Sequence, residues 1–74
     1  MPRAHRKALR AGIDWIRTMR CHGLHIATAE AIGVTPRTLT RILYQDGGAS
    51  RATVARVAEA RGVSVDALLK GEVT

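Results

Sequence analysis

The sequence predicts an all-α fold, a compact single domain of five short helices over residues 1–74, and three observations support this prediction. Apolar residues recur at three- and four-residue spacing, and no run alternates polar and apolar residues as a half-buried strand would. Glycines and hydroxyl residues stand between these runs, where helices end and begin. Phe is absent and Trp15 and Tyr44 are the only aromatic residues, so the core must consist of small aliphatic side chains, which suit helices packed on helices.

The first helix is expected from Pro2 to about His22, with Gly23 after its end. Its wide apolar face comprises Ala8, Leu9, Gly12, Ile13, Trp15, Ile16 and Met19. We interpret residues 1–7 as a loose basic arm whose Arg3 and Arg6 contact phosphate groups, and the rest as scaffold. A helix lying on an anionic membrane is the alternative, and it is disfavoured because so short a chain needs this apolar face for its core.

The next two helices are expected at His25–Ile32 and Pro36–Gln45, joined by a tight turn. Gly33 follows the first of them, and Thr35 supplies a hydroxyl N-cap to the second, whose first residue is a proline. Leu24 stands where a polar cap for the first would be expected, so its start has no clear signal.

The expected helix from Pro36 has two chemically different faces, because each residue advances by about 100° around the axis. One face carries Arg37, Thr40, Arg41 and Tyr44. The opposite face carries Leu39, Ile42 and Leu43. Such a helix can bury its aliphatic side in a core while its hydrogen-bond donors point outward. That polarity suits a helix in a DNA major groove, where side-chain donors read base edges.

Two further helices complete the predicted fold. Ser50 is expected to cap a helix ending at Arg61, and Ser64 to cap a short helix over Val65–Lys70, with Asp66 in its first turn, where the helix dipole favours an acid. The core positions of this region are Val54, Val57, Ala58, Leu68 and Leu69. Residues 71–74 are a short tail.

The net charge of +6 is concentrated in the first part of the chain. Through Arg41, eight Lys or Arg residues accompany two acids, whereas from Ile42 onward four basic residues balance four acids. The excess positive charge therefore lies in the part that contains the two-faced helix. Nucleic acid is the polyanion that such a positive surface most often binds. A surface charged only for solubility is the alternative on charge alone.

Several classes of function have little support. A single cysteine excludes an internal disulfide and suits a reducing cytosol, and no apolar run approaches a membrane span or a signal peptide, so a cytoplasmic protein is expected. Cys21, His22 and His25 could ligate zinc, but no second Cys/His cluster supplies the remaining ligands. Cys21 also lacks the partners of a catalytic nucleophile. We therefore expect no metal, cofactor, small-molecule ligand or enzymatic activity.

Residues from about 16 to 70 resemble the helix-turn-helix domain of the Cro and λ-repressor family, also described as xenobiotic-response-element-like regulators. The resemblance lies in Ala29 at the helix crossing, Gly33-Val34 at the turn, and Leu39 and Arg41-Ile42 in the reading helix. It continues through Ser50, Thr53-Val54 and the closing stretch VAEARGVSVDALL at positions 57–69.

The resemblance implies a five-helix λ-repressor-like domain with the helix-turn-helix at its second and third helices. It also implies a transcriptional regulator, expected to be a small phage-type or operon autorepressor, as in anti-CRISPR operons. Such a protein would bind double-stranded operator DNA as a homodimer on an inverted repeat, with half-sites about 34 Å apart or a multiple of it. The fifth helix and tail, with Val73, are the expected dimer surface, and Trp15 is the second candidate.

Site residues follow from the faces of the helices and from this resemblance. The expected base contacts are Arg37, Thr38, Thr40 and Arg41. The expected phosphate contacts, besides Arg3 and Arg6, are His25, Ile26, Thr35, Tyr44, Ser50 and Arg51, several of them through free amides at helix N-termini. Arg37 or Arg41 could instead contact only phosphate, and Tyr44 could instead cover the core.

Three positions depart from the family pattern. His25 replaces a glutamine that helps to position the phosphate backbone, so a mild pH dependence of binding is expected. Pro36 cannot donate a hydrogen bond where many relatives have a polar contact residue, and Thr28 is more often a larger apolar residue.

Two rival functions remain open at this point. One is an antitoxin-like or adaptor module that binds a protein, with DNA binding secondary. The basic and polar character of Arg37, Thr40 and Arg41 argues against it. The other is structured RNA as the target, which charge alone does not exclude.

Overall fold

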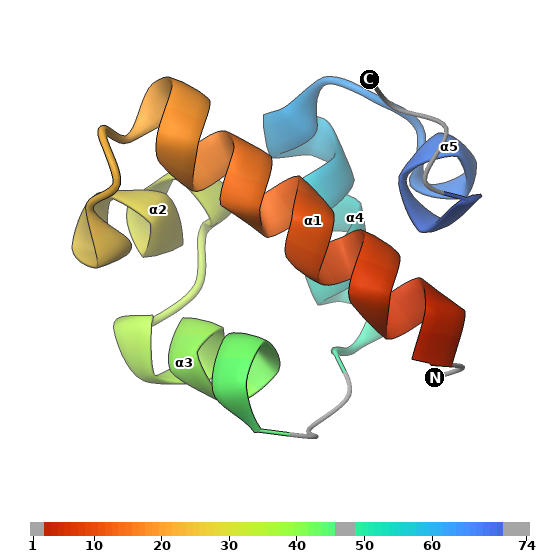
Figure 1. Ribbon diagram of the computed structural model, residues 1–74, viewed down its shortest axis with the longest axis horizontal. Coiled ribbons are helices and arrows are strands. Elements are labelled where there is room, and N and C mark those ends of the chain that lie inside the picture. The colour runs from red at the N-terminus through yellow and green to blue at the C-terminus, as the bar shows by residue number, and fades with distance from the viewer. Residues whose placement is uncertain (1–2, 46–48, 71–74) are drawn as a thin grey trace.

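The computed structural model describes residues 3–45 and 49–70, with only the backbone of residues 3 and 4. This part of the chain forms five α-helices and no strand (Figure 1). They are α1 (Arg3–Arg20), α2 (His25–Ile32), α3 (Pro36–Tyr44), α4 (Arg51–Arg61) and α5 (Val65–Lys70). The all-α prediction is therefore confirmed, and each helix lies within two residues of its expected bounds.

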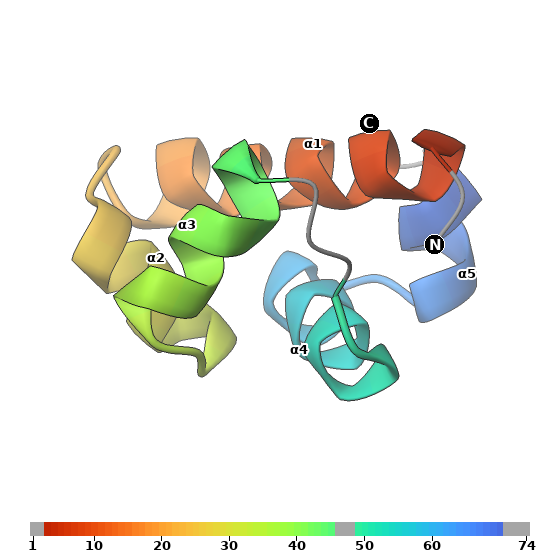
Figure 2. The same cartoon turned by 90° about the horizontal axis from the view of Figure 1, so that it is seen from below.

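The long helix α1 is the support on which the other helices are assembled. It packs against α2, α4 and α5, and Figure 2 shows it running along one side of the molecule while α2, α3 and α4 lie on the other. Leu9, Ile13 and Ile16 of α1 are at most 1% exposed and form the middle of the core. Met19, expected in the same apolar face, is instead 66% exposed, because it lies in the last turn of α1 where no neighbouring helix covers it.

Both ends of α1 differ from expectation. The helix already begins at Arg3, so the residues interpreted as a loose arm are helical from this position onward. It ends at Arg20, two residues early, because His22 adopts a left-handed φ of 52° and Gly23 follows with a φ of 77°. The amide of Gly23 then donates to the carbonyl of Arg17 at 2.9 Å, which closes the C-terminus of the helix.

The turn between α2 and α3 is fixed by local chemistry. Gly33 has a φ of 88° and donates its amide to the carbonyl of Ala29, as a left-handed helix C-cap requires. The hydroxyl oxygen of Thr35 accepts the amide of Thr38 at 3.1 Å, which caps α3. Leu39 is fully buried, so α3 leaves the turn with its aliphatic side toward the core.

The helices α4 and α5 pack against α1 and complete the core. Ser50 caps α4 and Ser64 caps the start of α5, each by accepting an amide three residues later. Val57 and Leu68 are buried against α1, whereas Leu69 is only half-buried. None of the helices described is long and apolar enough to cross a membrane.

Candidate nucleic-acid interface

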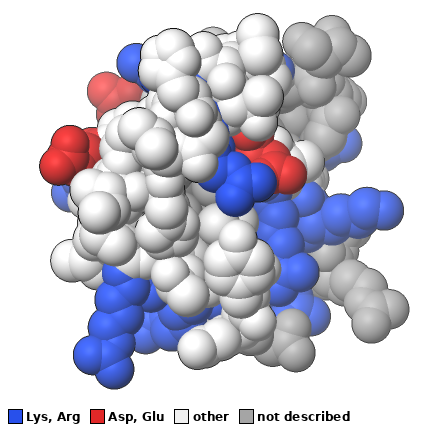
Figure 3. Space-filling model, turned by 60° about the vertical axis from the view of Figure 1, so that its left-hand side comes forward, with Lys and Arg blue, Asp and Glu red and all other residues white. Residues whose placement is uncertain are grey.

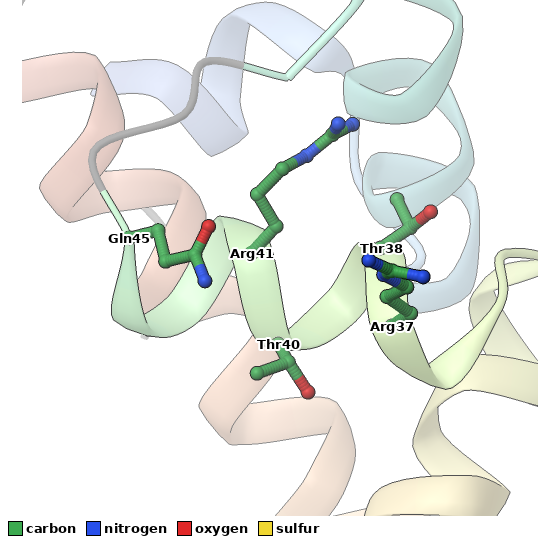
Figure 4. A pocket seen from close by; sticks show the side chains of 5 residues that line it. All are labelled: Arg37, Thr38, Thr40, Arg41 and Gln45. Carbon is green, nitrogen blue, oxygen red and sulfur yellow. The ribbon is translucent and has the colours of Figure 1, made fainter.

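The outward side of α3 is a basic and polar surface above a buried aliphatic one. Leu39 and Ile42 are buried, whereas Arg37 and Arg41 are exposed. A shallow hollow of about 360 Å³ lies on this side (Figure 4), lined by Arg37, Thr38, Thr40, Arg41 and Gln45. Helical periodicity therefore placed the two arginines correctly, outside the core and next to each other along one helix.

The guanidinium groups of Arg37 and Arg41 are not used inside the protein. Neither has a hydrogen-bond, ion-pair or ring partner within residues 3–45 and 49–70. Several arginines on other surfaces do have such partners. Arg17 pairs with Asp14, and Arg20 donates to the carbonyl of Ala60 at 2.6 Å. The available cationic donors of α3 thus face outward, where an external acceptor can reach them.

Thr40, expected as a base contact, lies differently from the two arginines. Figure 4 shows Thr38 and Arg41 extending to one side of α3 and Thr40 to the other. Its hydroxyl donates to the carbonyl of Pro36 at 3.0 Å and lies 3.0 Å from Nε2 of His25. Because this hydroxyl is engaged within the protein, Thr40 contributes to the position of α3 instead of offering a free donor.

His25, expected as a phosphate contact, joins α2 to α3. Its Nε2 atom lies 3.0 Å from the carbonyl oxygen of Pro36, at the first residue of α3. At the other end of α3, Nε of Arg10 donates to the carbonyl of Ile42 at 3.4 Å. One side chain from α2 and one from α1 therefore hold the two ends of this helix.

The other expected phosphate contacts divide into backbone and side-chain groups. The hydroxyl oxygens of Thr35 and Ser50 serve as N-caps. The groups that remain available to a phosphate there are the other backbone amides at the starts of α3 and α4. Arg51, the first residue of α4, is exposed and has no partner in the described part of the chain. Ile26 exposes 64% of its surface near the start of α2, and Arg6 is half-buried.

Charge on this side of the molecule is unevenly distributed. In Figure 3, which brings the left side of Figure 1 forward, the larger groups of Lys and Arg lie in the lower half, at the level of α3, on either side of uncharged residues. The acidic groups visible in that view all lie in the upper half. The basic part of the surface therefore coincides with the side on which α3 lies.

No protein-family model, curated protein or solved structure matches this chain. The function of the surface is therefore inferred from its geometry and charge.

Three other expectations concern residues away from α3. Cys21 is buried, and no group of three or more His, Cys, Asp or Glu side chains in the described residues is arranged to hold a metal ion. Trp15 is half-buried, with the guanidinium of Arg61 3.7 Å from the centre of its ring, so it offers little free apolar surface. Arg3 as a side chain and Val73 lie outside the described residues.

Tyr44 is 68% exposed, so it does not cover the core, and its phenol is open to solvent.

Sequence reasoning missed two residues of this surface. Gln45 lines the hollow beside Arg41, and its four-residue spacing from that arginine was a signal that could have identified it. Arg10 gave no such signal, because its contact with Ile42 joins residues far apart in the sequence.

Proposed function

We propose that this protein is a sequence-specific DNA-binding regulator in which α2 and α3 form a helix-turn-helix within a λ-repressor-like domain, and α3 enters the major groove. The observation that carries the proposal is the pair of exposed guanidinium groups, Arg37 and Arg41, without intramolecular partners in the described residues, on a helix whose opposite side is buried. Arginine donors match the two acceptors on the major-groove edge of guanine.

The spacing of the two arginines indicates how they would read a site. Four helical residues span about 6 Å, and one base-pair step is about 3.4 Å. Arg37 and Arg41 would therefore contact bases about two steps apart. Thr38, on the same side of α3 as Arg41, could contact a base between them or a neighbouring thymine methyl (Figure 4).

Phosphate contacts would flank this reading helix. Free amides and partial positive charge lie at the start of α2, near His25 and Ile26, and at the start of α4, where Arg51 adds a side-chain cation. Tyr44 would contribute its exposed phenol. Such contacts position a protein on the duplex without reading sequence, and they make its binding sensitive to salt.

A homodimer on an inverted-repeat operator is the proposed state, because one nine-residue helix covers few base pairs. The proposed dimer surface is the outer side of α5. There, Val65 and Leu69 line a shallow groove of about 760 Å³ together with His5 of α1, Ala49, and Arg51, Val54 and Ala55 of α4. The expected role is that of a cytoplasmic phage-type or operon autorepressor, without enzymatic activity.

Selection of bound sequences from a random DNA pool tests the proposal, followed by affinity measurements on the recovered site. Arg37→Ala and Arg41→Ala should each weaken binding by about 5- to 150-fold, the equivalent of 1–3 kcal/mol, and leave the melting temperature unchanged. Arg17→Ala is the matched control, because it removes the same charge from a side chain paired with Asp14. Its effect on affinity should be several-fold at most.

Two results would contradict the proposal. If the pool yields no enriched sequence, this surface does not read DNA. The exposed apolar side chains of Met19, Leu24 and Ile26 would then favour the rival function, a protein-interaction module. If all three arginine variants weaken binding equally, the protein recognises charge and not sequence.

A further inference from the structure

The imidazole of His25 is held in one orientation by α3. Its Nε2 atom is 3.0 Å from the Pro36 carbonyl oxygen and 3.0 Å from Oγ1 of Thr40. The Thr40 hydroxyl is itself 3.0 Å from the same carbonyl and donates its hydrogen there. Nε2 therefore faces two oxygen acceptors in the first turn of α3.

This arrangement determines which ring nitrogen carries the proton. A carbonyl oxygen can only accept, so an unprotonated Nε2 would place its lone pair against that of Pro36. A protonated Nε2 instead donates to Pro36, Thr40 or both. Neutral His25 must therefore be the Nε2–H tautomer, with an unprotonated Nδ1.

The Nδ1 atom is open to solvent. It has no hydrogen-bond partner in the described part of the chain. No buried side-chain nitrogen or oxygen of the described residues lacks a partner, so Nδ1 cannot be buried. Since His25 is the first residue of α2, this atom lies at the helix end where the proposed function places a phosphate.

We propose that His25 is a positioning residue whose protonation is coupled to DNA binding: Nε2–H holds the first turn of α3, and Nδ1 gains a proton in order to donate to a phosphate. This inference rests on the proposed function. A neutral imidazole of this tautomer would turn a lone pair toward the phosphate oxygen, whereas the cation turns an N–H toward it. The complex therefore binds more protons than the separate molecules do.

The titratable groups around α2 are mostly cationic. Glu30 lies on α2 and His22 precedes it; the helices packed against α2 carry His5, Arg6, Lys7, Arg10, Asp14, Arg17 and Arg20 on α1, Arg37, Arg41 and Tyr44 on α3, and Arg51, Arg56, Glu59 and Arg61 on α4. Arg56 is engaged at the opposite end of α2, where it donates to the carbonyl of Gly33. A bound phosphate would add negative charge beside Nδ1, which favours a proton on this atom in the complex.

The coupling has a defined sign and size. If one proton is taken up on binding, affinity rises as the pH falls, by at most tenfold per pH unit. Histidine changes charge between about pH 5 and 8, so the effect falls in an accessible range. We expect affinity for the selected operator to rise about tenfold from pH 8 to pH 6 at constant salt.

The decisive experiment compares pH profiles of affinity for the full chain and its histidine variants. In His25→Gln the side-chain amide can still donate to Pro36 but does not titrate, so the profile should become flat while sequence preference is kept. His22→Gln is the matched control and should retain the full pH dependence. A wild-type profile that is flat, or a His25→Gln profile as steep as that of the wild type, would overturn the inference.

Two-dimensional NMR of the histidine side chains provides a measurement that needs no variant. Neutral His25 should show the Nε2–H tautomer in the free protein, and its titration midpoint should move up by about one pH unit on adding operator DNA. A Nδ1–H tautomer, or a midpoint unmoved by DNA, would refute the coupling. A protein that binds no specific DNA at any pH would instead refute the proposed function.

Discussion

Gly12 of α1 faces Leu68 of α5, and its replacement by alanine provides a sharp test of the packing. The glycine is buried in the middle of α1. A Cβ atom built on it would lie 2.5 Å from Cδ1 of Leu68 and 3.7 Å from Cγ1 of Val57. Contacts between carbon atoms are normally about 3.5–4.0 Å, so only the Leu68 contact is too close.

Two effects of opposite sign decide the result of Gly12→Ala. Alanine is favoured over glycine inside a helix by about 1 kcal/mol. Against this gain, the Leu68 methyl group must move about 1 Å or more within a buried site, and overpacking of this kind costs about 1–3 kcal/mol. The net expectation is a loss of up to about 2 kcal/mol in the free energy of unfolding, or up to about 16 °C in melting temperature.

A second substitution separates the two effects. Leu68→Val removes both Cδ atoms, so in that background the close contact is lost, and the ordinary contacts at 3.7 Å with Val57 and at 3.8 Å with the position of Cγ of Leu68 remain. There Gly12→Ala should stabilise the protein by about 1 kcal/mol, a reversal of sign measurable by urea unfolding followed by circular dichroism. If Gly12→Ala stabilises the wild type as much as it stabilises the Leu68→Val variant, the close approach of α1 and α5 is not as described.

Three further predictions concern the N-cap of α3, a buried hydroxyl in α2 and the two glycine C-caps of α2 and α4. Thr35→Ala removes the N-cap and should lower stability by about 1 kcal/mol in thermal unfolding, whereas an unchanged melting temperature would show that the cap is unimportant. Thr28→Val should alter the free energy of unfolding by less than about 0.5 kcal/mol. The hydroxyl that is lost donates only to the carbonyl of Leu24, and this carbonyl still accepts the amide of residue 28. A loss above about 2 kcal/mol would show that the hydroxyl matters. Gly62→Ala and Gly33→Ala should each cost about 1–2 kcal/mol, because both glycines have a φ above 80°. The new Cβ at Gly33 would lie 2.6 Å from Nη1 of Arg56, but this exposed side-chain end can move aside, so a much larger loss at Gly33 would contradict the comparison.

Features set by neighbouring residues in the sequence were predicted well. The caps at Thr35 and Ser50 and the helix end at Gly33 depend on a few adjacent residues, and the structure contains each of them. The aliphatic side of α3 followed from helical periodicity, and Leu39 and Ile42 are buried as expected. The direction in which α3 presents its arginines could be derived from the sequence for the same reason.

Features that depend on how helices cross were not predicted. Met19 continues the apolar spacing of α1 but lies beyond the surface that the other helices cover. Thr40 shares a helical face with Arg41, yet the approach of α2 brings His25 against its hydroxyl. Periodicity shows which side of a helix a residue occupies, and only the neighbouring helix determines whether a polar group there is free.

The way α3 is held bears on the proposed function, because side chains that read a site must be able to change without loss of the fold. A nine-residue helix is too short to be stable alone in water, so its position must come from its caps and its neighbours. These are the buried Leu39 and Ile42, the hydroxyl cap at its start, and the hydrogen bonds made by His25 and Arg10. None of these contacts uses the side chain of Arg37 or Arg41. If α3 reads DNA as proposed, these two residues could therefore change with the operator while the helix keeps its place.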